Sequence, residues 1–222
     1  MSSYHSIAER IVSVIFSPES IRGVADGVLS IPVDLAYLGR GFIDTETRYQ
    51  RQDETMRLIQ AAQRGLFTAI HFSDAVEKVI SLFATYVPQK KQDGFYRHSL
   101  FSVGGRMVTA NFVSTIIARS ILNTQKLTAL QGLLRGGASS IILFGGMVER
   151  CIYKSMTLND KNHTLYKKLR YPNDLDFLYF LLEDYISPFI DALTVQQREG
   201  DIAFNQIISI VEGEIKSRGI LV

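Results

Sequence analysis

Apolar residues recur along most of the chain at spacings of three and four positions, the periodicity of helices that bury one face. Between residues 66 and 86 these positions are Ile70, Val76, Val79, Ile80 and Phe83. The alternation of apolar and polar residues that is typical of strands is scarce. The sequence therefore predicts an all-α protein, a compact multi-helix bundle in a single domain of residues 1–222.

Capping and breaking residues predict where the first helices begin and end. Ser6 and Glu9 match a capping box, so a helix should begin near residue 7. The segment 23–41 is apolar but interrupted by aspartate and proline, which predicts short or kinked helical pieces. Asp44 can cap a more polar helix that runs to about Gly65.

The C-terminal third shows the same kind of signals. Residues 171–174 read Tyr-Pro-Asn-Asp, which predicts a turn before a helix over 175–193 that is kinked at Pro188. Asp201 can cap a last amphipathic helix that runs to Lys216. We therefore expect two C-terminal helices with a break between them.

The helix expected after Asp44 carries charges of both signs. They are Glu46, Arg48, Arg51, Asp53, Glu54 and Arg57. Alternating signs are typical of a helix face in water, and we expect these side chains to be solvated.

The stretch from Phe101 to Ile152 is strongly apolar, rich in glycine and nearly free of acidic residues. It predicts two hydrophobic helices joined at residues 123–126, a helical hairpin within residues 98–155 that is central to the bundle. In the second helix, small residues lie opposite a bulky apolar stripe, so one face can pack backbone against backbone. Gly132, Gly136 and Ser140 have the small-xxx-small spacing of closely packed membrane helices.

The length of the uncharged runs limits what the hairpin can do. The longest run, residues 136–148, has 13 residues. As a helix it would cover about 20 Å of a hydrocarbon core that is roughly 30 Å thick. A permanent transmembrane helix is therefore excluded, whereas conditional insertion remains open.

The net charge of +2 conceals an uneven distribution. Residues 1–87, the N-terminal helices, carry 8 basic and 10 acidic side chains, whereas residues 88–171 carry 13 and 3. Residues 172–214, within the acidic C-terminal helices of 172–222, carry 1 and 9. We hypothesise that the basic segment docks on anionic lipid and that the acidic segment covers it in the soluble form. The lipid-docking candidates are Lys90, Lys91, Arg97, Lys126, Lys154, Lys167 and Lys168.

The sequence gives little support for metal binding, nucleic-acid binding or catalysis. The four histidines are widely spaced without a zinc-binding pattern, so neither a metal nor another cofactor is expected. Cys151 should be a buried structural thiol, and Glu183, Asp184 and Asp191 an exposed acidic helix face. Nucleic-acid binding is not expected, because the cations are interleaved with bulky aliphatic residues. We therefore do not expect an enzyme.

The run from Arg135 to Phe144-Gly145-Gly146, RGGASSIILFGG, lies in an all-helical chain without a recognisable signal peptide. In length and pattern the chain resembles the small cation-selective pore-forming effectors of type VI secretion, known from Serratia and relatives, and more broadly the pore domains of colicins. The resemblance implies an antibacterial toxin that starts in the cytoplasm of the producer and reaches the inner membrane of a target cell. It also implies a secretion-apparatus carrier, a cognate immunity protein, ion leakage and a homo-oligomer in the membrane.

The resemblance also implies roles for residues of the hairpin. The helix-packing residues would be Gly132, Gly136, Gly137, Ser140, Gly145 and Gly146, and Arg135 and Glu149 would lie at the pore mouth or act as snorkelling anchors. The alternative is a soluble helical interaction protein, of the immunity or adaptor type, in which the hairpin is the buried central pair. Both hypotheses remain open at the level of sequence.

Overall fold

The computed structural model describes residues 3–16, 31–88, 117 and 140–217. Among these residues 89% are helical and none lies in a strand, which confirms the all-α prediction. Most of the predicted hairpin, residues 98–116 and 118–139, lies outside the described residues.

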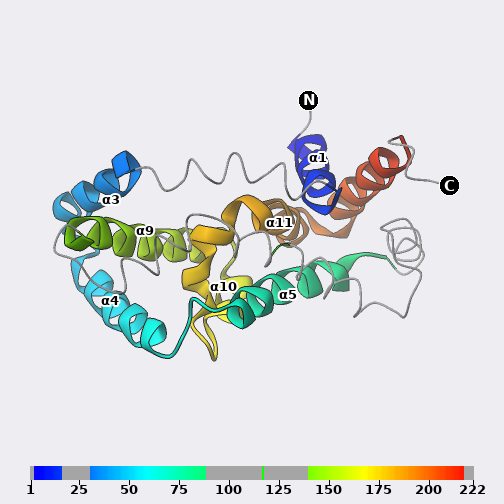
Figure 1. Cartoon of the computed structure of the whole chain (residues 1–222). Coiled ribbons are helices and arrows are strands. Elements are labelled where there is room, and N and C mark those ends of the chain that lie inside the picture. The colour runs from blue at the N-terminus through cyan, green and yellow to red at the C-terminus, as the bar shows by residue number, and fades with distance from the viewer. Residues whose placement is uncertain (1–2, 17–30, 89–116, 118–139, 218–222) are drawn as a thin grey trace.

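The helices follow one another as shown in Figure 1. They are α1 (Ser3–Phe16), α3 (Ile31–Ile43), α4 (Arg48–Gln63), α5 (Ala69–Tyr86), α9 (Ser140–Lys161), α10 (His163–Arg170), the 3₁₀ helix η1 (Leu175–Leu178) and α11 (Tyr179–Ser217). Helix α11 changes direction at Gly200, whose φ of 83° lies in the left-handed region that glycine tolerates. This break confirms the expected separation between the two C-terminal helices.

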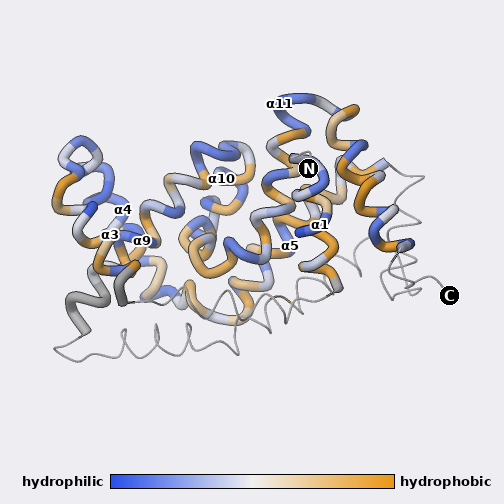
Figure 2. The backbone as a smooth tube through the Cα atoms, turned by 90° about the horizontal axis from the view of Figure 1, so that it is seen from above, coloured by the Kyte–Doolittle hydropathy of each residue, from blue (hydrophilic) through white to orange (hydrophobic). Residues whose placement is uncertain are grey.

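The apolar core of the described residues lies between α1, α5, α9 and α11. At its centre Phe83 of α5 packs edge to face with Phe189 and Phe204 of α11, at centroid distances of 5.2 and 5.4 Å. Hydrophobic and hydrophilic positions alternate along each of these helices in Figure 2, as one-sided burial requires.

Two predicted boundaries near the N-terminus are wrong. Helix α1 begins at Ser3 rather than near residue 7, because Tyr4 packs against the core and donates a hydrogen bond to Glu199 of α11. Helix α3 continues through Pro32 and Asp34, where breaks were expected. Proline in the first turn costs little, because the N–H that it lacks has no partner within the helix there.

Helices α3 and α4 and the start of α9 form one end of the molecule, on the left in Figure 1, away from the contact between α1 and α11. The most extensive contact of α3 is with α9. This end carries the described part of the predicted hairpin, residues 140–155. No helix in the described part of the chain is long and apolar enough to cross a bilayer.

Candidate functional site

The residues that the sequence predicted as functional fall into two groups in the structure. Gly145, Gly146 and Glu149 lie in the first half of α9, and Ser140 is its first residue. Lys154 lies further along α9, and Lys167 and Lys168 lie on α10. The remaining candidates are outside the described residues, namely Lys90, Lys91, Arg97, Lys126, Gly132, Arg135, Gly136 and Gly137. The candidate site is therefore the start of α9 together with the elements that cover it.

Gly146 lies where the backbone of α3 approaches α9. A Cβ atom at this position would be 2.3 Å from the carbonyl oxygen of Asp34 and 2.7 Å from its carbonyl carbon. At the neighbouring Gly145 a Cβ would meet only Leu38 Cδ1, at an ordinary distance of 3.4 Å. Gly146 thus packs backbone against backbone, and its partner is α3, which the sequence pattern did not identify.

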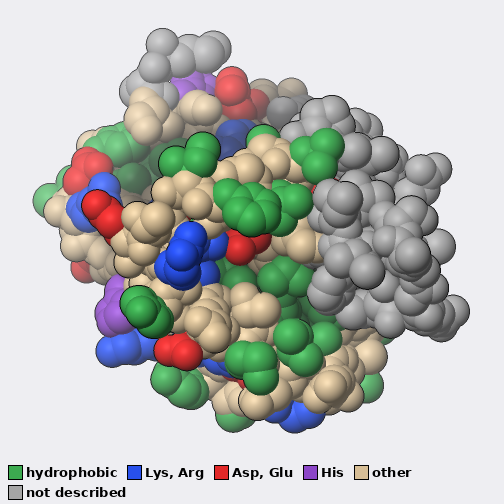
Figure 3. Space-filling view, turned by 90° about the vertical axis from the view of Figure 1, so that its left-hand side faces the viewer, with side chains coloured by type: hydrophobic (Ala, Val, Ile, Leu, Met, Phe, Trp, Pro, Cys, Tyr) green, Lys and Arg blue, Asp and Glu red, His purple; other side chains and the backbone are tan. Residues whose placement is uncertain are grey.

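Helix α3 is apolar in composition but little of it is buried. Within residues 33–43, Asp34 is the only buried residue, whereas Phe42 is 73% and Ile43 is 83% exposed. Figure 3 views this end of the molecule and shows hydrophobic side chains among charged ones on the surface. Helix α3 therefore covers the start of α9 without inserting a fully buried apolar side chain within this range.

An ion pair joins α3 to α9 beneath this surface. Asp34 Oδ1 lies 3.4 Å from Arg150 Nη1, and both side chains are more than nine-tenths buried. Burial raises the pKa of Asp34, while the attraction of Arg150 acts in the opposite direction. The direction of the shift indicates that the pair does not fully compensate the loss of hydration of this carboxylate.

Arg51 of α4 is the residue that ties α3, α4 and α9 together. Its Nη1 donates to both carboxylate oxygens of Glu149 at 2.8 Å. Its Nη2 donates to the carbonyl oxygens of Gly41 and Asp44, and its Nε donates to Thr47 Oγ1. A Cβ atom at Gly41 would lie 2.7 Å from the carboxylate carbon of Glu149, so glycine makes room for this pair. The carboxylate of Glu149, predicted to lie at a pore mouth or to act as a snorkelling anchor, is paired with Arg51 in this structure.

Asp44 holds the turn between α3 and α4. Its Oδ1 accepts a hydrogen bond from the backbone N–H of Thr47, which is itself the N-cap of α4, so Asp44 holds the turn before the helix and the prediction that it caps the helix is wrong. Its Oδ2 accepts from Thr47 Oγ1 and from the hydroxyl of Tyr153 on α9, both at 2.7 Å. These hydrogen bonds lower the pKa of Asp44 to about 2. The turn is thus also anchored to α9.

A second ionic cluster, centred on Arg57, joins α4 to η1. Arg57 binds both oxygens of the fully buried Asp176, at 2.9 and 2.6 Å, and donates to Asp174 at 2.7 Å and to Glu54. Its guanidinium lies over the ring of Phe177, 3.7 Å from the centroid. Burial acts to lower the pKa of Arg57, but the hydrogen bonds and attraction of the carboxylates outweigh it and raise the pKa.

The solvated face predicted for α4 is wrong in its central residues. Arg51 and Glu54 are buried, and Arg57 is 16% exposed. The buried residues of α4 are Arg51, Glu54, Leu58 and Ala61. This spacing of three and four positions is the signal of an inward face, which the alternating charges concealed.

The acidic helix face predicted around Glu183 and Asp191 is also not a free surface. Glu183 lies 2.5 Å from Lys154 Nζ, and Asp191 lies 2.5 Å from Lys161 Nζ and 3.0 Å from Arg10 Nη1. Both lysines belong to α9. Two carboxylates of the acidic segment thus pair with lysines of the basic segment, whereas the proposed docking of the basic segment on lipid stays a prediction.

Cys151 is buried, as predicted for a structural thiol. Its Sγ donates a hydrogen bond to the carbonyl oxygen of Phe177 at 3.1 Å, and burial raises its pKa well above the ordinary value. The reactive thiolate form is therefore disfavoured.

No protein-family model, curated protein or solved structure matches the chain. A functional proposal must therefore rest on the residues and their geometry.

Proposed function

We propose that the protein is a membrane-active antibacterial toxin, which inserts its hydrophobic hairpin into the bacterial inner membrane and forms an ion-conducting pore that depolarises the cell. One observation carries the proposal. The start of α9 is covered by α3, which is held by the Asp34–Arg150 ion pair and a close backbone contact, while much of the apolar surface of α3 faces water. A covering helix of this kind is suited to a segment that must be released before it inserts into a membrane.

The free energy of removing α3 differs from that of removing a core helix. Each large apolar side chain that leaves a core costs about 1.5–3 kcal/mol. Helix α1 buries Ile7, Ile11, Val12 and Val14, whereas residues 33–43 of α3 bury only Asp34. Phe42 and Ile43 already face water, and their transfer into lipid would lower the free energy of the protein. Separation of α3 from α9 is therefore less costly than opening the core.

The charges at the end of the uncharged run support the same conclusion. Glu149 and Arg150 directly follow residues 136–148, and they pair with Arg51 and Asp34 respectively. Release of α3 and α4 from α9 would break both pairs. Lipid phosphates and water at the membrane surface offer replacement partners for these charges. Gly145 and Gly146, near the end of the 13-residue run, would then be free of their contacts with Leu38 and Asp34.

Vesicle leakage tests the proposal directly. Full-length protein should release an entrapped ion-sensitive dye from anionic vesicles. An Arg51→Leu variant, which loses the pair with Glu149, should release it at a higher initial rate. Arg48→Leu is the matched control, because Arg48 lies on the same helix but is exposed. It should behave as the unsubstituted protein.

Expression in bacteria provides the second measurement. Protein directed to the periplasm or kept in the cytoplasm should depolarise cells from at least one side, as read by a potential-sensitive dye. If neither location depolarises cells and vesicles of every lipid charge retain their contents, the toxin proposal is wrong.

A soluble interaction protein is the second candidate, and the exposed apolar side chains of α3 and α4 favour it. Phe42, Ile43, Tyr49 and Met56 are each more than half exposed. Clustered exposed apolar side chains are typical of surfaces that bind another protein. This candidate predicts no depolarisation and no leakage, so the same two assays distinguish it from the toxin.

A further inference from the structure

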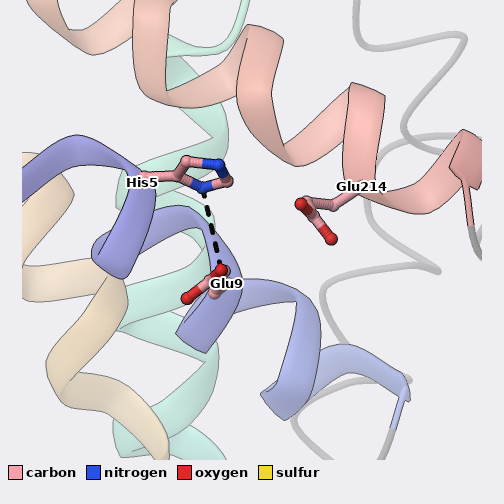
Figure 4. A group of neighbouring side chains, drawn as sticks. All are labelled: His5, Glu9 and Glu214. Atoms are coloured by element: carbon pink, nitrogen blue, oxygen red, sulfur yellow. Dashed lines mark ion pairs between the residues drawn. The ribbon is translucent and has the colours of Figure 1, made fainter. Parts of the chain in front are cut away.

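Three side chains with metal-binding atoms converge at the opposite end of the molecule from α3. His5 and Glu9 lie one turn apart on α1, and Glu214 lies on the last part of α11 (Figure 4). One ring nitrogen of His5 and one carboxylate oxygen of each glutamate all lie within 4.8 Å of one another. The distance from His5 Nδ1 to Glu9 Oε1 is 3.9 Å, which is too long for a hydrogen bond.

The Nδ1 atom of His5 is buried and has no hydrogen-bond partner. The two other described histidines satisfy this atom. His71 Nδ1 lies 3.0 Å from the carbonyl oxygen of Gly65, and His163 Nδ1 lies 2.6 Å from Asn159 Oδ1. A buried polar atom without a partner is costly. The Nδ1 atom of His5 lies beside the carboxylate of Glu9, and the carboxylate of Glu214 is close to the same ring, so a cation between the three groups would satisfy it.

We propose that His5, Glu9 and Glu214 bind a divalent transition-metal ion of the zinc type. Imidazole nitrogen and carboxylate oxygen are ligands that suit such ions. Positions i and i+4 place His5 and Glu9 on one face of α1, as in helical metal-binding motifs. Three protein ligands leave one tetrahedral position for water.

The distances are compatible with binding after small side-chain rotations. Ligand atoms at about 2.0–2.2 Å from a tetrahedral ion lie roughly 3.3 Å from one another. The three groups are each partly exposed, so their side chains can rotate from the present separations without movement of the helices. The sequence concealed this site, because Glu214 is far from Glu9 along the chain and only the packing of α1 on α11 brings them together.

The metal ion would reinforce a contact that already exists. Tyr4 donates to Glu199, and Arg10 pairs with Asp191 at 3.0 Å, so α1 is held on α11 without it. An ion that binds only the folded chain stabilises it, and this stabilisation grows with the logarithm of the ratio of the ion concentration to the dissociation constant. We therefore expect zinc to raise the melting temperature of the full-length protein, and the proposal does not depend on the toxin activity.

Isothermal titration of chelator-treated, full-length protein with zinc chloride tests the proposal. One ion should bind per chain, and His5→Ala and Glu214→Gln should each weaken binding at least about tenfold. His163→Ala and Glu212→Gln are matched controls, because His163 faces an amide one turn away and Glu212 lies on the same helix as Glu214. Neither control should change the affinity.

Nuclear magnetic resonance of the imidazole nitrogens identifies the atom that binds. On addition of zinc, the Nδ1 resonance of His5 should shift and the proton should remain on Nε2. Circular dichroism shows whether each variant is folded, and Glu214→Gln provides the test should His5→Ala not fold. Absence of binding at millimolar zinc, or equal affinity in the ligand variants and the controls, would overturn the proposal.

Discussion

Replacement of Gly146 by alanine should detach α3 from α9. The added Cβ would lie 2.3 Å from the carbonyl oxygen of Asp34, and ordinary contact begins at 3.4 Å. The backbone of α3 must therefore move by about 1 Å, because neither partner is a flexible side chain. This movement also strains the Asp34–Arg150 pair, which is already 3.4 Å long.

The expected free energy follows from two opposing contributions. Overpacking of this kind costs about 1–3 kcal/mol, and the backbone clash favours the upper half of that range. Alanine in a helix interior gains up to about 1 kcal/mol over glycine. Gly146→Ala should thus lower the free energy of unfolding by about 1–2 kcal/mol. At Gly145 the added Cβ meets only Leu38 at 3.4 Å, so Gly145→Ala should be neutral or stabilising by up to about 1 kcal/mol.

Urea denaturation followed by circular dichroism measures the difference between these adjacent substitutions, which should be about 2–3 kcal/mol. Hydrogen exchange of the α3 amides should accelerate in Gly146→Ala but not in Gly145→Ala, which locates the effect. Equal stability and equal exchange in the two variants would refute the close contact between α3 and α9.

Three further predictions concern single residues. Arg51→Leu should lower the free energy of unfolding by about 3 kcal/mol, which is near the low end for breaking a buried ion pair, because the side chain of Glu149 is 20% exposed. The exposed control Arg48→Leu should change this free energy little in the same urea experiment. Asp44→Asn should make the free energy of unfolding depend less on pH in acid. The pKa of Asp44 is about 2 in the folded protein and 3.8 in the unfolded chain. The stability that its carboxylate contributes is therefore complete above pH 3.8 and is lost as the pH falls towards 2. Urea midpoints at pH 5 and 2.5 check this, and equal pH dependence in both proteins would contradict it. Gly213→Ala should raise the free energy of unfolding by up to about 1 kcal/mol, and with it the melting temperature, because the new methyl group meets no atom within 4 Å at this exposed position of α11. An unchanged or lower melting temperature would contradict this.

Much of the local structure could be predicted from the sequence. The periodic apolar positions of α5 and the break near residue 200 reflect interactions within a few residues. The hydrogen bond from Thr47 to Asp44 is also local, but it holds the turn before α4 and does not cap the helix, whose N-cap is Thr47. The start of α1 was misplaced, because Tyr4 is held by the distant α11.

The candidate site was only partly predictable. Glycine and apolar content indicated that the start of α9 is a packing surface, and the structure places Gly146 close to the backbone of α3. The pattern did not reveal that α3 is the partner, nor that Arg51 and Arg57 are buried in ionic clusters. Charged residues are usually exposed, so their burial becomes predictable only when the opposite charges that accompany them are known.

The sequence by itself determined the all-helical class, the break between the last two helices and the apolar, glycine-rich character of the segment that leads into α9. These properties follow from backbone conformation and from spacing along a single helix. Tertiary structure decided that α3 covers the start of α9, that Glu149 pairs with Arg51, and that His5 and Glu9 meet Glu214. Helical periodicity specifies which side of a helix faces inward but not which helix lies opposite, and these contacts join residues far apart in the chain.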